Sequence, residues 1–327
     1  MDRILLSIII PCYNSYNLMK KGLSYLEKNY DYPFEVVVVD DCSTDSSYRD
    51  LLDYSNNSKL RILVLENSKN VGPGESRNFG ITRASGKYIV FLDADDWFEE
   101  NFFDTIFPLL RKDPDCVVFD FEYVYDDKEK QPYSIFYSKQ EVGIIDPAKA
   151  LVFVRSGTWG KVYKRDIIVQ NGVKFLSMKK GEDFPFTKIS VSKCKTIIYT
   201  DKTHYEYYQH NSSLMHTNTH DNYLGMFNAF MEIYKNVYKD YPDEVEGIFV
   251  YECLYSTGIS TTSLLDRHNW KEYIEKLESL FPHYFKNPYL PYFPVRIRVL
   301  LKVIHFRMYN LVKTMNHIQN SIKSAIH

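Results

Sequence analysis

The stretch Lys87 to Trp97, reading KYIVFLDADDW, constrains the fold more than any other, because a short apolar run leads directly into three carboxylates. Tyr88 to Leu92 have the length and the β-branched and aromatic content of a buried strand. Asp93, Asp95 and Asp96 cannot be buried without partners, so we expect them where the strand ends. Ligands of open α/β sheets bind beyond the carboxyl ends of the strands, and these acids therefore mark a candidate site.

Two interpretations of this acidic turn are open. Asp93 and Asp95 offer hard oxygen ligands that can bind a divalent cation, and such a cation can hold a diphosphate. Alternatively, the turn caps the next helix, with Asp96 as the N-cap of a helix over Phe98 to Leu110. The rest of the chain has to decide between them.

Composition limits the class of protein. A length of 327 residues predicts one large domain and a smaller appended region. The net charge of -2 excludes a generally basic nucleic-acid binder. The five cysteines have no metal-ligand spacing, which favours reduced thiols and a cytoplasmic location. No apolar run is long enough for a signal peptide or a membrane span.

Apolar runs and helical spacings alternate over the first third of the chain. This order, with polar residues after each apolar run, predicts a parallel sheet with right-handed crossovers and all polar loops at one edge. The expected strands are Ile4 to Ile10, Phe34 to Val39, Leu60 to Leu65 and Tyr88 to Leu92, and the expected helices are Ser15 to Asn29, Ser46 to Tyr54 and Gly74 to Ala84.

A glycine-containing turn, Asn70 to Asn78, precedes the fourth strand and carries Arg77 at the start of a helix. Glycines permit a tight backbone path, and a helix N-terminus with an arginine favours an anionic ligand. The spacing matches neither known glycine-rich phosphate signature, so a simple turn and helix cap is the alternative.

The middle of the chain contains one more pair of acids, and its apolar runs predict further strands. Glu182 and Asp183 precede an apolar helical pattern, where Asp183 is either a helix cap or a catalytic carboxylate. His210 lies in a loop and is either a metal or phosphate ligand or a solvated side chain. Strands are expected over Cys116 to Tyr125, Thr196 to Tyr199 and His204 to Tyr208, a polar excursion over Asp126 to Ser138, and a helix over Asp146 to Arg155 with Asp146 as its N-cap.

Six motifs in order, SIIIPCYN, VVVVDDCSTD, NVGPGESRN, YIVFLDADDW, WGKVYKRD and GEDFPF, resemble those of the family 2 inverting glycosyltransferases. The resemblance covers roughly residues 4 to 213. It implies the GT-A fold, a Rossmann-like and mostly parallel α/β sheet flanked by helices. It also implies a nucleotide-sugar donor, by default a UDP-sugar, and a divalent metal, Mn²⁺ or Mg²⁺.

The resemblance implies a role for each motif. The loop after the first strand would pack on the nucleotide base, Asp41 would accept a hydrogen bond from uracil, and Asp93-Ala94-Asp95 would be the D-x-D motif. Asp183 would be the general base of the Glu182-Asp183 pair. The implied donor-binding residues are Pro11, Tyr13, Asn14, Asp41, Arg77, Asp93, Trp159 and Lys161, and the implied metal ligands are Asp95, Asp93 and His210.

The chain departs from the family pattern at two turns. Cys42 stands where a glycine commonly follows the acids of the second strand, so we expect a different turn conformation there. Gly72-Pro73-Gly74 and Ser76 alter the turn before Arg77 but leave the arginine in place.

Three functions are compatible with these motifs. The first is a hexosyltransferase or N-acetylhexosaminyltransferase that acts on a lipid- or protein-linked glycan. The second is a scaffold protein that binds nucleotides but has lost catalysis, although Asp95 and Asp183 are both present. The third is a nucleotidyltransferase. That function would need a glycine-rich and basic loop directly after the first strand, and the loop at this place in the chain is not of that kind.

The last third of the chain is expected to be a helical region, residues 216–327, appended to a catalytic domain, residues 1–215. Its final segment, Phe293 to Ile326, places apolar residues at helical spacing among basic ones, and no acid follows Glu278. Such a segment suits an anionic membrane surface at the inner face of the membrane. It equally suits packing on the protein's own helices or on a second subunit.

Overall fold

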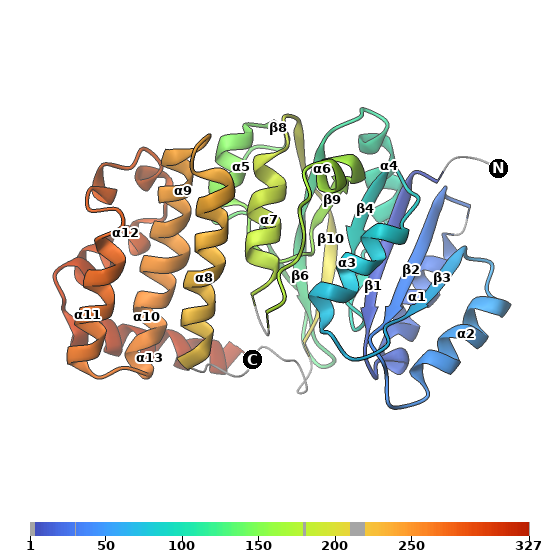
Figure 1. Cartoon of the computed structure of the whole chain (residues 1–327), viewed down its shortest axis with the longest axis horizontal. Helices are drawn as coiled ribbons and strands as arrows, with labels where there is room; N and C mark the ends of the chain where they lie inside the picture. The colour runs from blue at the N-terminus through green and yellow to red at the C-terminus, as the bar shows by residue number, and fades with distance from the viewer. Residues whose placement is uncertain (1–3, 30, 179–180, 210–219, 327) are drawn as a thin grey trace. The chain divides into compact units, whose positions relative to one another are not determined.

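The computed structural model describes residues 4–29, 31–178, 181–209 and 220–326. Its contacts divide the chain into two compact units, an α/β unit and a helical unit (Figure 1). Unit 1 comprises Met1–Ala150 and Val154–Met215, and unit 2 comprises Leu151–Phe153 and His216–His327.

Unit 1 is built on one mixed sheet of ten strands in the order β3-β2-β1-β4-β9-β6-β10-β5, with β7 on β6 and β8 on β10. The strands from β3 to β4 are parallel, as the sequence predicts. The bounds are β1 Leu6–Cys12, β2 Phe34–Asp40, β3 Ile62–Glu66, β4 Tyr88–Phe91, β5 Trp97–Phe98, β6 Cys116–Val124, β7 Gln131–Tyr133, β8 Gly143–Ile145, β9 Lys161–Lys164 and β10 Ile197–Tyr208.

The second half of the sheet departs from the expected pattern. Strand β9, which the sequence did not predict, runs antiparallel between β4 and β6. The two strands expected over 196–199 and 204–208 are one strand, β10, with an irregularity between Thr200 and His204. The excursion after β6 contains the short strand β7, which pairs with β6.

The helices of unit 1 cover both faces of the sheet. Helix α3 packs on β1 and β2, where Gly80 lies so close to Ile9 that an added Cβ would stand 2.5 Å from its Cγ2 atom. Helix α5 begins after Asp146, whose side chain accepts from the Ala148 amide, which confirms the predicted N-cap. The bounds are α1 Tyr16–Lys28, α2 Ser47–Asn57, α3 Pro73–Arg83, α4 Phe102–Leu110, α5 Pro147–Phe153, α6 Arg165–Gln170 and α7 Asp183–Ser192.

Strand β1 is buried along almost its whole length, because helices lie on both faces of the parallel sheet. Its one hydroxyl, Ser7 Oγ, donates to the buried carboxylate of Glu35 at 2.7 Å. Glu35 also accepts from the Ser85 amide at 2.6 Å. This polar cluster lies at the start of β1, at the end of the strands opposite to the acidic turn after β4.

Unit 2 is helical, as the sequence predicts for this region. Between α8 and α11 the chain forms a series of short helices around a π-helical stretch, Phe249–Thr257. None of the described helices is long and apolar enough to cross a membrane. The principal bounds are α8 His220–Val237, α9 Pro242–Ile248, α10 Gly258–Ser260, α11 Arg267–Glu278, α12 Val295–His305 and α13 Tyr309–Ile326, with 3-10 turns at Thr261–Ser263, Tyr284–Lys286 and Leu290–Tyr292.

Candidate active site

The loops after β1 and β2 are joined by Asn14. Its side-chain Oδ1 atom accepts from the backbone amide of Thr44 at 2.8 Å, and its backbone amide donates to Ser43 Oγ at 2.9 Å. Asn14 takes φ 51°, a left-handed conformation that asparagine tolerates better than most residues. The side chain of Asn14 therefore fixes the path of both loops at the carboxyl edge of the sheet.

Two neighbours of Asn14 show how this edge is shaped. Tyr13 is 44% exposed, whereas Pro11 remains within β1. Cys42 has φ 60°, which is the region that glycine favours. The cysteine therefore adopts a left-handed backbone conformation that a glycine would also adopt.

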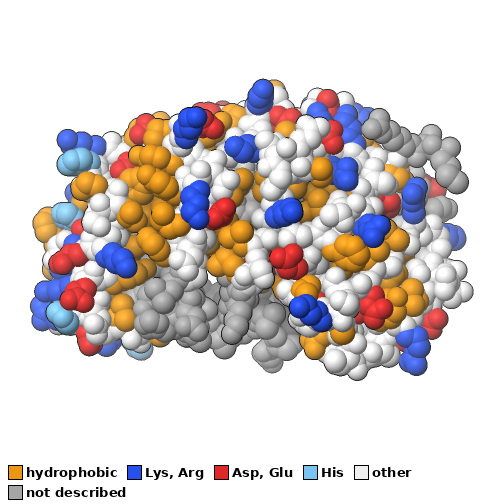
Figure 2. Space-filling view, in the orientation of Figure 1, with side chains coloured by type: hydrophobic (Ala, Val, Ile, Leu, Met, Phe, Trp, Pro, Cys, Tyr) orange, Lys and Arg blue, Asp and Glu red, His pale blue; other side chains and the backbone are white. Residues whose placement is uncertain are grey.

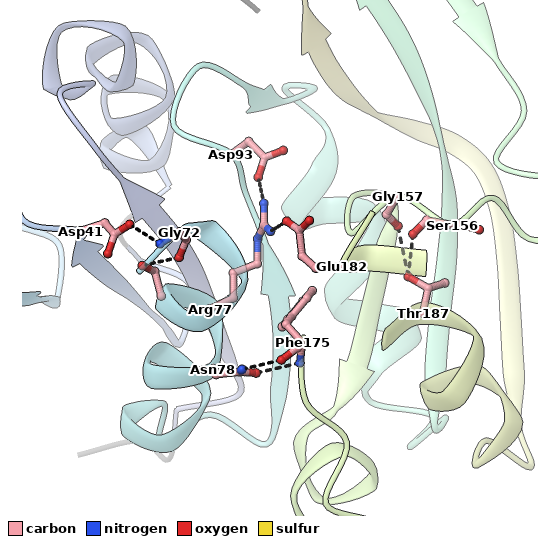
Figure 3. Close-up of polar contacts among 11 residues, drawn as sticks. Asp41, Gly72, Arg77, Asn78, Asp93, Ser156, Gly157, Phe175, Glu182 and Thr187 are labelled. Atoms are coloured by element: carbon pink, nitrogen blue, oxygen red, sulfur yellow. Dashed lines mark hydrogen bonds and ion pairs between the residues drawn. The ribbon is translucent and has the colours of Figure 1, made fainter. Parts of the chain in front are cut away.

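Asp41 organises the glycine-containing turn. One carboxylate oxygen accepts from Asn67 Nδ2 at 2.8 Å and from the Val71 amide at 2.9 Å. The other accepts from the Gly72 amide at 2.7 Å (Figure 3). Gly72 has φ 89°, which a side chain would strain, so the turn needs glycine here. The buried Asp41 thus connects the end of β2 to the start of α3.

Arg77 lies between the two acidic motifs. It extends from α3, and its Nη2 atom contacts Asp93 Oδ1 at 2.6 Å while its Nη1 atom contacts Glu182 Oε1 at 3.3 Å (Figure 3). The arginine side chain is only 7% exposed, so these pairs are screened little by water. Arg77 therefore holds the turn after β4 and the start of α7 at one place.

Asp96 has a structural role that differs from the helix-cap interpretation. Helix α4 begins at Phe102 with Asn101 at its N-cap, so Asp96 caps no helix and that interpretation is wrong. Asp96 is buried instead and accepts from the Tyr205 hydroxyl at 2.6 Å and from the Tyr208 amide at 2.8 Å. Burial, and then the charge of Asp93, raise the pKa of Asp96 well above its usual range.

Tyr205 is a residue that sequence reasoning missed. From β10 its hydroxyl donates to Asp96 and accepts from the Asp93 amide at 3.0 Å. It therefore fixes the backbone of the acidic turn from the neighbouring half of the sheet. No sequence signal separates Tyr205 from the other tyrosines of its strand, because its partners lie more than a hundred residues away.

Asp183 is the first residue of α7, and the N-cap position is taken by Glu182, without a capping side-chain hydrogen bond. The helix-cap interpretation of Asp183 is therefore not borne out. Burial, and then the negative charge of Glu182, raise the pKa of Asp183 to about 7, although Arg77 acts in the opposite direction. Such a carboxylate can accept a proton near neutral pH.

Trp159 lies in the loop before β9, and Lys161 is the first residue of that strand. Lys161 is fully buried, and its Nζ atom donates to the Gly157 carbonyl at 2.7 Å and to the Trp159 carbonyl at 3.0 Å. Burial lowers the pKa of Lys161 to about 7. From α7, Thr187 Oγ1 donates to the Ser156 carbonyl at 2.9 Å (Figure 3). Lys161 thus shapes the loop from inside, whereas the half-buried Trp159 packs on Phe121.

Asn78 connects helix α3 to the segment before α7. Its side-chain amide donates to the Phe175 carbonyl and accepts from the Phe175 amide, each at 2.9 Å (Figure 3). The Phe175 ring stacks on Phe186 with centroids 3.8 Å apart. Two adjacent residues of α3, Arg77 and Asn78, therefore both hold the region of the acidic pair. No local pattern predicts this role for Asn78, because its partner lies 97 residues away.

The acidic turn supplies part of the ligand set that a divalent cation needs. Asp95 is half-buried, and one oxygen of Asp93 is already bound by Arg77. Mg²⁺ in proteins is commonly held by one or two carboxylates together with substrate phosphates, which these two acids can supply. Within the described ranges, no group of three metal-ligating side chains is found, and the candidate ligand His210 lies outside them.

Comparison with known proteins identifies the family. The profile described as Glycosyl transferase family 2 matches residues 7–169, the region that contains Asn14, Asp41, Arg77 and the acidic turn. The chain belongs to glycosyltransferase family 2. It is therefore a nucleotide-sugar-dependent glycosyltransferase, and this removes the nucleotidyltransferase interpretation.

Relatives within family 2 come from bacteria. The chain is 27% identical over 253 residues to the uncharacterized glycosyltransferase YibD of Escherichia coli, covering 73% of each protein. It is 31% identical over 206 residues to the poly(ribitol-phosphate) β-N-acetylglucosaminyltransferase TarS of Staphylococcus aureus, covering 61% of this chain. That alignment spans only 35% of the length of TarS.

Similar solved structures show the fold. The crystal structure of S. aureus TarS 1–349 in complex with UDP-GlcNAc superposes with a TM-score of 0.70 at 20% identity, covering 97% of this chain and 92% of that one. A mannosyltransferase from Pyrobaculum calidifontis in complex with GDP-Man and Mn²⁺ superposes with a TM-score of 0.51 at 14% identity, covering 95% and 86%. The predicted GT-A fold is confirmed.

Proposed function

We propose that the protein transfers a sugar from a UDP-sugar to a hydroxyl group of a glycan, with inversion at the anomeric carbon and Asp183 as the general base. The observation that carries this proposal is the arrangement around Arg77, which holds the acidic turn and the Glu182-Asp183 pair together. Donor and acceptor chemistry both need this proximity, because the attacking hydroxyl and the departing diphosphate act on one carbon.

The general base takes the proton of the acceptor hydroxyl as its oxygen attacks the anomeric carbon. A base works best when its pKa lies near the working pH, and the pKa of Asp183 is about 7. Glu182, already bound to Arg77, positions the start of α7 and raises the pKa of its neighbour. Proton transfer is therefore assigned to Asp183 and positioning to Glu182.

The donor pocket is proposed at the loops after β1, β2 and β3. The exposed ring of Tyr13 would pack on the base, and Asp41 would face uracil while it also holds the turn at Gly72. UDP-GlcNAc is the first donor to test, because the similar TarS structure is a complex with it. Lys161, being fully buried, would act on the donor only through the loop of Trp159.

Asp95 and Asp93 would hold a Mn²⁺ or Mg²⁺ ion together with the donor diphosphate. Such an ion supplies positive charge that stabilises the leaving diphosphate. Arg77 neutralises Asp93 from the protein side, and Asp96 is excluded from the ligand set because its oxygens are bonded to Tyr205 and Tyr208.

A nucleotide-binding screen tests the donor and the metal together. The thermal midpoint of the full chain is measured with UDP and GDP in the presence of Mn²⁺, Mg²⁺ or a chelator. A ligand that binds only the folded state raises the midpoint, and at about 100 times its Kd it adds about 2.7 kcal/mol. We expect the largest shift for UDP with Mn²⁺ and its loss in chelator, whereas no shift with either nucleotide would contradict the proposal.

The inactive scaffold is the alternative that this screen does not exclude. It would bind UDP as the enzyme does but release no UDP from a UDP-sugar. Both Asp95 and Asp183 are present and Arg77 holds their motifs, so no observation favours loss of activity.

A further inference from the structure

Helix α12 and the residue that follows it carry three apolar side chains that are largely exposed. Val295, Val299 and Phe306 are 64%, 49% and 70% exposed. Val295 and Val299 are four residues apart, so they lie on one side of the helix, and Phe306 directly follows its last residue, His305. The opposite side, with Ile297, Leu300 and Ile304, forms the buried contact of the helix.

Basic residues flank this apolar side on both edges. Arg298 and Lys302, four residues apart, lie along one edge, and Arg296 lies on the other. Arg296 and Lys302 are exposed. We call the six residues the α12 strip: Val295, Arg296, Arg298, Val299, Lys302 and Phe306.

The acidic residue nearest in sequence is already neutralised. Glu278, the last acid of the chain, contacts Arg307 at 2.8 Å and His305 at 3.0 Å. The 49 residues that follow contain seven of the 40 Lys and Arg residues and none of the 42 acids. By contrast, the face of the molecule in Figure 2 mixes basic and acidic side chains without a patch of one sign. The α12 strip therefore contains three basic residues and no acidic one.

We propose that the α12 strip binds the surface of an anionic lipid bilayer. An interfacial helix inserts an apolar face at the headgroup level and keeps basic residues beside the lipid phosphates, and the strip has both features. This inference is independent of the donor sugar and adds a partner that the proposed reaction does not require.

A second copy of the chain fits the strip less well. In a two-fold contact the strip would face itself, so Arg296, Arg298 and Lys302 would meet the same three residues. Like charges across an interface weaken association, and the strip contains no carboxylate to compensate them. Charge complementarity therefore favours a negatively charged partner.

Vesicle flotation of the full chain tests the proposal. Vesicles of phosphatidylcholine alone are compared with vesicles that also contain phosphatidylglycerol, at low and high salt. Each basic residue near such a surface contributes about 1 kcal/mol, so the double variant R296Q/K302Q should bind anionic vesicles about 30-fold more weakly. The variant F306S should also bind more weakly, because it removes the most exposed apolar side chain.

The matched control is K112Q/K195Q, which removes the same charge from two exposed lysines of unit 1. Binding to anionic vesicles that is retained in this control and lost in the two strip variants supports the proposal. Two results would overturn it directly: no preference for anionic vesicles, or equal binding by R296Q/K302Q and the control. Undiminished binding by F306S would also overturn it, because it would indicate a site for a soluble polyanion. A lower solution mass of F306S than of the wild type would also overturn it, in favour of a second copy.

Discussion

At the scale of single residues, the proposed role of Asp183 as general base makes the reaction depend on the ionisation of this side chain. Only the carboxylate accepts a proton, so the form that is active is the one present above a pKa of about 7. We predict that kcat/KM for UDP release falls about tenfold per pH unit below that pKa and levels off above it. A pH series with donor and metal held constant measures this, and a flat profile through neutral pH would count against Asp183 as the base.

Arg77 is expected both to stabilise the folded protein and to lower the pKa of Asp183. Breaking a buried ion pair by removing one partner typically costs about 3–5 kcal/mol, so R77Q should lower the free energy of unfolding by about 3 kcal/mol or more. Arg77 lowers the pKa of Asp183, so its loss should move the pH midpoint of the reaction upward. Denaturant unfolding and the pH series are the two measurements.

The conservative variant R77K separates charge from geometry. It keeps a cation but cannot contact both Asp93 and Glu182 with a planar fork. It should therefore shift the pH midpoint less than R77Q does, while still losing stability. Equal pH profiles for R77Q and the wild type would show that Arg77 does not act on Asp183.

At the scale of elements, the polar cluster at the start of β1 should stabilise the sheet without acting on the reaction. In E35A the Ser7 hydroxyl loses its acceptor in a buried place, where an unsatisfied group costs about 1–3 kcal/mol, and the part-buried bond from the Ser85 amide is lost as well. We predict a loss of about 2–4 kcal/mol in the free energy of unfolding, with UDP release per folded molecule unchanged.

Glu66, exposed at the end of β3, provides the control for E35A. Surface substitutions of this kind are usually within about 0.5 kcal/mol of the wild type. If E66A destabilised the protein as much as E35A, the buried cluster could not be the cause.

The sequence predicted the parallel half of the sheet well, because β1, β2 and β4 are continuous apolar runs that end in polar residues. It failed at β9 and β5, which are four and two residues long and carry no periodicity of their own. Both are strands only because longer neighbours pair with them. Short strands of this kind are set by tertiary contacts.

The candidate site shows the same difference between residues that a local pattern identifies and residues that act through distant contacts. The acids were found because carboxylates after an apolar strand are conspicuous in a sequence. Their supports, Tyr205 and Asn78, were not found, because each contacts residues about a hundred positions away. The local pattern left a helix cap open as one interpretation of Asp96, whereas its hydrogen bonds come from β10.

At the scale of the whole molecule, the two units differ in charge and in proposed task. Unit 1 contains the described residues to which donor binding and proton transfer are assigned, and unit 2 carries the α12 strip. A variant of the strip should therefore change vesicle binding but leave UDP release in solution as it is. The central claim of the account is sugar transfer from a UDP-sugar with Asp183 as the general base. It rests on unit 1 alone.

UDP release from UDP-GlcNAc by the wild type, D183N and D166N, measured beside the Kd of each for UDP, tests that claim most directly. Asp166 is the control, because it is likewise an acid in the first turn of a helix but is exposed. We predict that D183N loses about 100- to 10,000-fold in rate while its Kd for UDP and the rate of D166N stay near the wild-type values. A D183N enzyme that releases UDP as fast as the wild type would contradict the account.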